Sequence, residues 1–160
     1  DRRQRQMCIR DRDGSLAGWE NAVTAPGDAT IETGDGKITY SVANVGEADW
    51  NLQLKQMGLS LEQGESYTLK CTLFSDVDRV VKVAVMTPSA GYAWHGGEDV
   101  VLTAGEAKDI TLTITPKEEV FTDGITVDTG AGLFFSMGYV EGYTLGAHTV
   151  SISNVSFVKN

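Results

Sequence analysis

The sequence is short of basic residues, cysteine and long apolar runs, and each shortage argues against a class of protein. Its 160 residues include 13 Lys and Arg against 22 Asp and Glu, so the formal net charge is −9. Nucleic acids and anionic membranes are bound by basic patches, and we therefore expect neither as a partner. No apolar run approaches the ~20 residues that a membrane-spanning helix needs. We expect a chain that folds around its own core and does not enter a membrane.

Residues 1–12 differ in character from the rest of the chain. The run RRQRQMCIRD from Arg2 to Asp11 back-translates into a reading frame that resembles a transposase-type sequencing adapter. We interpret residues 1–12 as a non-native, disordered segment and exclude them from the fold, the alternative being a basic arm for nucleic acid or membrane. Without them the formal charge is −12, because five of the 13 basic and two of the 22 acidic residues lie there. Cys8 is also lost, which leaves Cys71 as a small core residue without a disulfide partner.

Residues 13–160 repeat short period-two patterns of apolar and polar residues, and no stretch has the period of an amphipathic helix. Turn signals such as Gly34-Asp35-Gly36 and Glu62-Gln63-Gly64 separate the patterns. Many short strands joined by Gly-rich turns predict one all-β domain, an antiparallel β-sandwich. The expected strands are 29–32, 37–45, 50–57, 66–74, 79–87, 99–102, 108–115, 133–139 and 148–158.

Alternation assigns the side chains of these strands to two faces. The inner face carries mainly apolar residues, namely Leu52, Leu54, Tyr67, Leu69, Cys71, Leu73, Val81, Val83, Val85, Leu133, Phe135 and Met137. The outer face carries Asn51, Gln53, Lys55, Thr68, Lys70, Thr72, Lys82, Ala84, Met86, Phe134 and Ser136. If strands 50–57, 66–74, 79–87 and 133–139 are neighbours in one sheet, their outer faces form a polar concavity with aromatic members and few acids. In so acidic a domain, this segregation predicts a binding surface.

The strand at 50–57 indicates the kind of ligand. A solvated sheet face usually carries Lys, Glu and Thr, whereas this strand carries Trp50, Asn51 and Gln53 at its polar positions. A face of tryptophan, amides and one cation suits a neutral, polyhydroxylated ligand.

Four motifs together resemble the carbohydrate-binding modules of the family 4, 9 and 22 group. They are Gly18-Trp19, residues 50–69 in the form WxLQLxQxGLxLxxGxxYxL, FSMG at 135–138 and VSISNVSF at 150–157. The resemblance implies a jelly-roll sandwich whose concave sheet holds a single glycan chain, such as a β-glucan or xylan. It also implies that the module is part of a secreted or cell-surface bacterial glycoside hydrolase, with the catalytic domain in the same full-length chain.

The chain departs from that family at its start. Most members open with a strand containing an Asn-Gly-x-Phe-Glu-like segment, and residues 1–12 stand in its place, so we expect the native first strand to be missing and an edge to be exposed. Related modules often hold a structural calcium ion between their first and last strands. Here the last strand offers Asn154, no other ligand is assigned, and no cofactor is required.

Three candidate binding residues come from the strands. Gln53 points outward, and the family places an amide at this motif, which suits hydrogen bonds to sugar hydroxyls. Lys82 interrupts a run of valines on the outer face, where the family often has a cation. Trp50 has the parity of Leu52, so contact with a ligand and packing in the core both remain open.

The stretch GYAWHGG at 91–97 is expected to be a projecting loop. Tyr92 and Trp94 would stack on the apolar faces of sugar rings, the alternative being collapse onto the edge of the sandwich, while His95 is expected to be a bystander. Phe134 and Ser136 are candidates by parity alone. We expect Trp19 to plug the core, and Tyr139 and Tyr143 to pack in an ordinary loop, although each could reach the ligand.

Catalysis finds little support in the sequence. Glycoside hydrolysis needs two carboxylates across the scissile bond, and the candidate acids, Glu47 with Asp49 and Glu98 with Asp99, lie at strand edges. There is no nucleophile elbow and no ordinary zinc-ligand spacing. The expected function is therefore a non-catalytic glycan-binding module. Two alternatives remain: a structural sandwich of a cell-surface or multidomain protein, with its loop aromatics packed down, and a hydrolase with paired carboxylates in the concavity.

Overall fold

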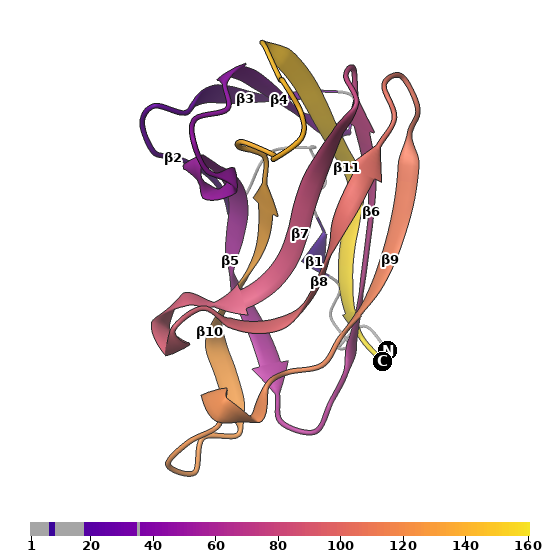
Figure 1. Ribbon diagram of the computed structural model, residues 1–160. Coiled ribbons are helices and arrows are strands. Elements are labelled where there is room, and N and C mark those ends of the chain that lie inside the picture. The colour runs from indigo at the N-terminus through magenta and orange to yellow at the C-terminus, as the bar shows by residue number, and fades with distance from the viewer. Residues whose placement is uncertain (1–6, 9–17, 35) are drawn as a thin grey trace.

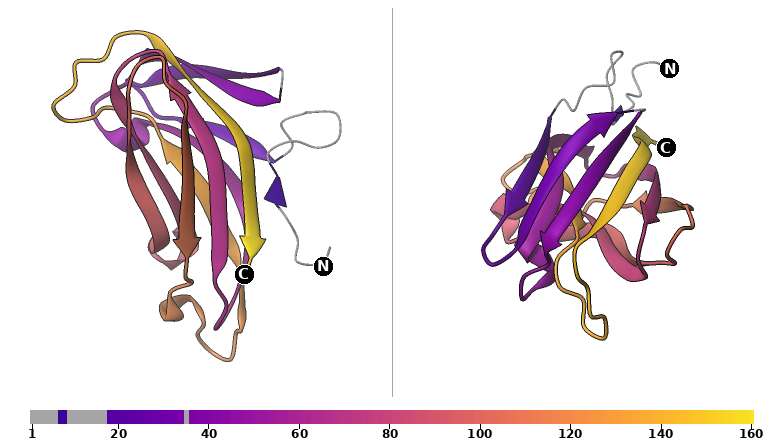
Figure 2. Two further views of the ribbon diagram at one scale, coloured as in Figure 1. Left: turned by 90° about the vertical axis from the view of Figure 1, so that its right-hand side faces the viewer. Right: turned by 90° about the horizontal axis from the view of Figure 1, so that it is seen from above.

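A computed structural model describes residues 7–8, 18–34 and 36–160 of the chain. Within them, two antiparallel sheets lie face to face, as Figures 1 and 2 show. Sheet A has the order β3-β4-β11-β6-β9, with β1 also paired to β11, and sheet B has the order β2-β5-β10-β7-β8. The β-sandwich predicted from the alternating patterns is confirmed. The helical turns of the described residues are three residues long, and none could cross a membrane.

The bounds of the elements are as follows. Sheet A contains β1 (Met7–Cys8), β3 (Asp28–Gly34), β4 (Lys37–Asn44), β6 (Tyr67–Ser75), β9 (Lys108–Ile114) and β11 (His148–Lys159). Sheet B contains β2 (Trp19–Val23), β5 (Leu52–Glu62), β7 (Arg79–Thr87), β8 (Ala93–Leu102) and β10 (Val127–Ser136). The 3₁₀ turns are η1 (Asp49–Asn51), η2 (Pro88–Ala90) and η3 (Glu118–Val120).

The core lies between the sheets and consists of the residues that alternation assigned to the inner face. All twelve residues, from Leu52 to Met137, are buried. Residues of further strands, such as Ile38, Val100 and Ile152, complete the core. Burying one such aliphatic side chain stabilises the fold by roughly 1.5–3 kcal/mol. The period-two pattern therefore identified the interior correctly.

A bulge at Gly58 lengthens β5 beyond its predicted end at residue 57. Leu52 and Leu54 face the core, and so do Leu59 and Leu61, although the two pairs have opposite parity. The register with β10 shifts at this point, where Gly58 adopts a left-handed φ of 89°. One extra residue restores the inward direction of the second pair, and the strand continues to Glu62.

The consecutive strands β5 and β6 do not pair with each other. β5 belongs to sheet B and β6 to sheet A, so the turn after Glu62 carries the chain from one sheet to the other. The condition under which Thr68, Lys70 and Thr72 would share a concavity with Gln53, that their strands are neighbours in one sheet, is therefore not met. Alternation specifies which face a residue occupies within a strand, but it does not specify the neighbouring strand.

Two strands of sheet B differ from the sequence-based expectation. β8 begins at Ala93, so Trp94 and His95 belong to a strand and not to a projecting loop. β2, which starts at Trp19, was not predicted as a strand at all. The register partner of Trp19 on β5 is Gln56.

The edge of β11 that lies beyond β4 meets the start of the chain. β4 pairs with β11 as far as Ser153, and further along the same strand Met7 and Cys8 pair with Phe157 and Ser156. These are the two described residues of the 1–12 segment. The expectation of disorder for the remainder of that segment falls outside the described residues.

Candidate functional site

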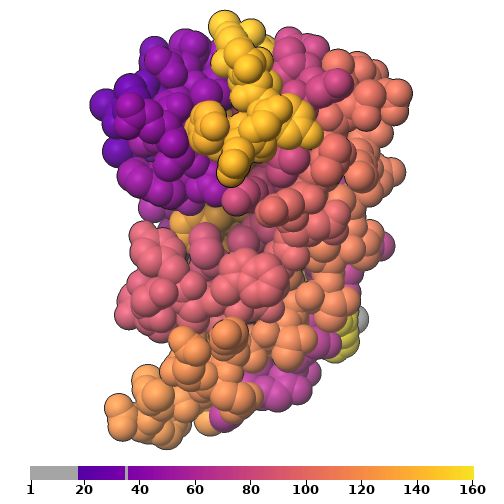
Figure 3. Space-filling model, in the orientation of Figure 1, coloured from indigo at the N-terminus to yellow at the C-terminus, as the bar shows by residue number. Residues whose placement is uncertain are grey.

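The outer face of sheet B carries two adjoining hollows. The first, of about 430 Å³, lies over β7, β8 and β10, and the second, of about 420 Å³, lies towards η1 and the loop that follows β10. Both are lined by Asp49, Lys82 and Asp99, so they meet at the middle of β7. In Figure 3 the surface is hollowed between the purple residues and the pink strands β7 and β8. We call the two hollows together the cleft.

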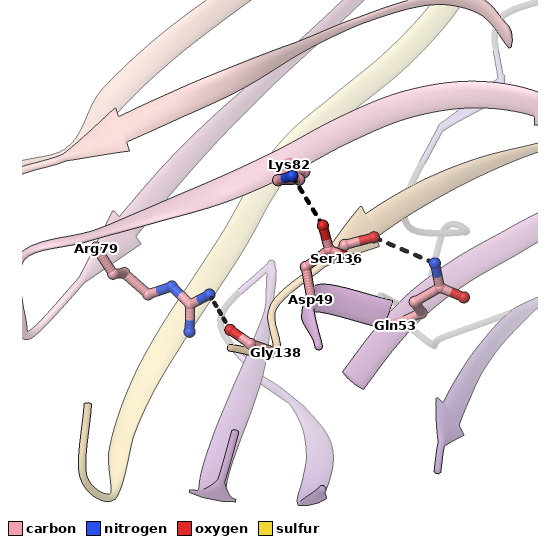
Figure 4. Close-up of polar contacts among 6 residues, drawn as sticks. All are labelled: Asp49, Gln53, Arg79, Lys82, Ser136 and Gly138. Carbon is pink, nitrogen blue, oxygen red and sulfur yellow. Dashed lines mark hydrogen bonds and ion pairs between the residues drawn. The ribbon is translucent and has the colours of Figure 1, made fainter. Parts of the chain in front are cut away.

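A row of polar side chains crosses the sheet at the junction of the hollows. The strand registers align Gln53 with Ser136, Ser136 with Lys82, and Lys82 with Asp99. The amide Nε2 of Gln53 donates to Oγ of Ser136 at 3.2 Å, and Nζ of Lys82 lies 2.8 Å from Oδ2 of Asp49 (Figure 4). The hydrogen bond to Asp49 raises the pKa of Lys82. Three predicted residues, Gln53, Lys82 and Ser136, thus come together in one row.

Asn51 builds the turn that carries Asp49 and Trp50. Its Oδ1 accepts hydrogen bonds from the backbone N–H groups of Glu47 and Ala48 at 2.9 and 2.7 Å, and it is buried. The expectation that Asn51 lies on the outer face is therefore wrong. Because the chain turns here before β5 begins, the parity argument for Trp50 does not apply. Trp50 is 55% exposed and lines the second hollow.

Tyr92 lines neither hollow, whereas Trp94, two residues later, stands at the end of the cleft opposite Trp50. Tyr92 and Trp94 are 58% and 49% exposed, and Trp94 lines the first hollow. The connection from β7 to β8 passes through two left-handed residues, Gly91 and Tyr92, with φ of 67° and 59°. Both side chains stay about half exposed, although the ring of Tyr92 contacts Phe134 on the face of the sheet.

Phe134 points outward, as parity predicted, but it is only 1% exposed and cannot offer a surface to a ligand. The Tyr92 ring packs against it edge-on at 6.5 Å between centroids, and Nζ of Lys55 lies 5.9 Å from its ring centre. The prediction of direct ligand contact by Phe134 is therefore wrong. It instead supports the ring of Tyr92 from below.

Arg79 anchors the loop that bounds the second hollow. Its side chain is buried in the core, and its guanidinium donates to the carbonyl oxygens of Met137 and Gly138 at 3.0 Å each (Figure 4). Burial lowers the pKa of Arg79 to about 10, and no carboxylate of the described residues forms an ion pair with it. A side chain at Gly138 would collide with the Ala48 carbonyl oxygen. The loop is thus held against η1.

The loop anchored by Arg79 brings Tyr139 and Tyr143 to the second hollow, which contradicts the expectation of ordinary loop packing. Trp19, by contrast, is buried against Phe135 as expected. His95 is also buried and makes specific hydrogen bonds, so it is not a bystander.

Acidic side chains are more prominent in the cleft than the sequence suggested. Asp49, Glu98, Asp99 and Glu141 line the two hollows, and Lys82 is the one basic residue lining them within the described chain. Sequence reasoning considered Asp49 and Asp99 only as candidate catalytic acids and did not assign them to the binding site; Asp49 lies in η1 and Asp99 in β8. Their proximity to Lys82 depends on sheet order.

No group of three His, Cys, Asp or Glu side chains among the described residues could hold a metal ion. Asn154, the residue noted for calcium, donates from Nδ2 to the hydroxyl of Thr72 at 3.2 Å. Calcium binding stays a prediction that thermal unfolding with calcium and with EDTA would test.

A model of a carbohydrate-binding domain family, CBM_4_9, matches residues 11–130. The chain belongs to this family. It resembles a solved family 4 carbohydrate-binding module with a TM-score of 0.71 and 19% identity over 98% of this chain and 95% of that one. It also resembles the N-terminal cellulose-binding domain of Cellulomonas fimi β-1,4-glucanase C, with a TM-score of 0.67 and 20% identity over 97% and 94% of the two chains.

Among curated proteins, a cellulose 1,4-β-cellobiosidase of Acetivibrio thermocellus is 35% identical over 49 residues. The match covers 31% of this chain and 6% of that enzyme, so the carbohydrate-binding domain corresponds to a small part of its length.

Proposed function

We propose that this carbohydrate-binding domain holds a single β-glucan or xylan chain in the cleft of sheet B. The observation that carries the proposal is the exposure of Trp94 at one end of the cleft and of Trp50 at the other, with a polar row between them; Tyr92 is exposed beside Trp94. Aromatic faces stack on the apolar faces of pyranose rings, and the amide and ammonium groups match sugar hydroxyls.

The alternative of a purely structural sandwich predicts that Tyr92 and Trp94 pack down, and their exposure argues against it. The alternative of a hydrolase predicts carboxylates that face each other across the concavity. Asp49, Glu98, Asp99 and Glu141 do line the cleft, but Asp49 is bound to Lys82 at 2.8 Å, and Asp99 is the register neighbour of Lys82. A general acid has to deliver a proton to the leaving oxygen, and an aspartate engaged by an ammonium is poorly suited to that task.

The wider context extends this proposal. As a carbohydrate-binding domain with partial similarity to a cellobiosidase, the chain fits a role as the accessory module of a secreted or cell-surface glycoside hydrolase. The catalytic domain would then lie in the same full-length protein, and the module would hold that domain close to its polysaccharide.

Affinity gel electrophoresis tests the binding function directly. Gels containing barley β-glucan, laminarin, xylan or hydroxyethylcellulose should retard the domain, and the pattern of retardation names the glycan class. Circular dichroism or NMR establishes that the sample is folded. Equal mobility of a folded sample in all four gels and in a glycan-free gel would contradict the proposal.

A further inference from the structure

His95, the residue that follows Trp94 in β8, belongs to a chain of hydrogen bonds. The backbone N–H of Lys117 donates to Nδ1 of His95 at 2.9 Å, and Nε2 of His95 lies 2.7 Å from Oγ1 of Thr87. The Thr87 hydroxyl donates to Oδ2 of Asp128 at 2.6 Å. His95 and Thr87 are buried. The chain of bonds therefore joins β8, β7 and β10 to the segment that follows β9.

These contacts determine which nitrogen of His95 carries the proton. Because Nδ1 accepts from Lys117, the neutral ring carries its proton on Nε2 and donates it to Thr87, whose own proton goes to Asp128. A second proton on Nδ1 would point at the Lys117 N–H, donor against donor. Protonation therefore breaks the bond that ties β8 to residue 117.

The charges around the ring oppose one another. Burial is the largest effect and lowers the pKa of His95 below its ordinary 6.5, and the positive charge of Lys117 acts in the same direction. The negative charges of Asp128 on β10 and Glu119 on η3 act against it. The neutral ring is thus the form that the folded domain favours at neutral pH.

His95 is also the residue that turns Trp94 towards the cleft. The register between β7 and β8 passes from Val85 opposite Gly96 to Met86 opposite Trp94, which leaves His95 as the extra residue of a β-bulge. Its backbone oxygen accepts from the N–H of Thr115 at 3.3 Å. A bulge changes the direction in which neighbouring side chains point, so the anchoring of His95 inside the sandwich fixes Trp94 outside it.

We propose that neutral His95 is a positioning residue for Trp94, and that protonation of His95 displaces Trp94 and weakens glycan binding. The effect on binding rests on the proposed function, whereas the effect on the position of Trp94 does not. Burial lowers the pKa of His95 below 6.5, so the ring takes up its second proton only below that pH. Both effects should therefore appear as the pH falls below 6.5.

NMR of the ligand-free protein tests the positioning role by itself. Titration from about pH 7.5 to about pH 5 follows the ¹⁵N shifts of the His95 ring and the indole N–H signals of Trp94 and Trp50. The Trp94 signal should move with the midpoint of His95, while Trp50, at the other end of the cleft, should not follow it. A Trp94 signal that stays still while His95 titrates would overturn the proposal.

The binding arm uses cellohexaose titration and hydroxyethylcellulose gels over the same pH range. Loss of the Lys117 bond should weaken binding by about tenfold. His95→Asn keeps an acceptor for Lys117 but cannot titrate, so its affinity should no longer follow the pH. If neither probe binds at any pH, the proposed function fails, and the NMR result still decides the positioning role.

His148 provides the matched control, because burial also lowers its pKa and it lies next to Arg79 at 3.0 Å, away from Trp94. His148→Gln should keep the pH dependence of binding seen in the unmodified chain. A pH dependence that disappears in His148→Gln and persists in His95→Asn would assign the effect to His148 and overturn the proposal. If His95→Asn does not fold, the titration of the unmodified chain gives the decision.

Discussion

The outer faces of the two sheets follow the same alternating pattern, yet among the hollows described for residues 18–34 and 36–160 those with aromatic lining residues lie on sheet B. A hollow of about 310 Å³ on sheet A is lined by Thr68, Lys70, Ser156, Val158 and Asn160, and none of these residues is aromatic. On sheet B, Trp94 is presented by a bulge at one end, and Trp50 and Tyr139 come from η1 and a loop at the other. The comparison shows that the bulge in β8 and the segments outside the strands supply the aromatic residues of the cleft, which regular alternation along the strands does not provide on sheet A.

Replacing one outer aromatic residue on each sheet should give the largest contrast. Trp94→Ala removes a half-exposed ring from the cleft and should weaken glycan binding by roughly thirtyfold, about 2 kcal/mol. Phe74→Ala, on the outer face of sheet A, should leave the affinity unchanged. Affinity gels and titration calorimetry with the retained glycan measure both. Similar losses in the two variants would mean that Trp94 acts through stability and not through contact.

The two lysines on the outer faces give a smaller contrast. Lys82→Ala removes a hydrogen-bond donor from the cleft and leaves Asp49 without its partner, so affinity should fall by about fivefold. Lys70→Ala on β6 is the matched change on sheet A and should have no effect on binding. Calorimetry at constant ionic strength compares them. Unchanged affinity in Lys82→Ala would remove Lys82 from the site.

The acidic residues of the cleft should give the smallest effect, a preference for neutral over negatively charged glycans. Asp49, Asp99 and Glu141 should repel a β-1,4-linked hexamer of glucuronate relative to cellohexaose. Asp99→Asn should improve binding of the charged hexamer by about threefold at low salt, because exposed charges interact by less than about 1 kcal/mol. Asp109→Asn, on the edge strand of sheet A, is the control. Equal gains for both variants would point to net charge and not to the cleft.

The sequence was sufficient for the fold class and for the interior, because both depend on the period of apolar residues within single strands. Leu52, Leu69 and Val83 faced inward on parity alone and do so in the fold. The bulge at Gly58 shows the limit of that argument, since one extra residue reverses the parity of Leu59 and Leu61. The bulge at His95 had the same consequence, and it hid the strand that carries Trp94.

The exposure of a side chain was harder to predict than the direction in which it points. Phe134 points outward as expected, yet it is covered by Tyr92, which lies more than forty residues earlier in the sequence. Asn51 has the polarity of a surface residue, but its side-chain oxygen accepts hydrogen bonds from the backbone N–H groups of Glu47 and Ala48, just before η1. Whether a polar or aromatic residue is available to a ligand depends on what packs over it, and local pattern contains no such information.

By itself, the sequence determined that the chain is a β-sandwich, which side chains fill it, and that Gln53, Lys82 and Ser136 point away from that core. Only the tertiary structure decided which strands are neighbours: it placed β6 in the opposite sheet and joined Gln53, Ser136 and Lys82 into one row. The physical reason is that alternation is set by the backbone of each strand, whereas sheet order is set by packing between segments far apart in the chain.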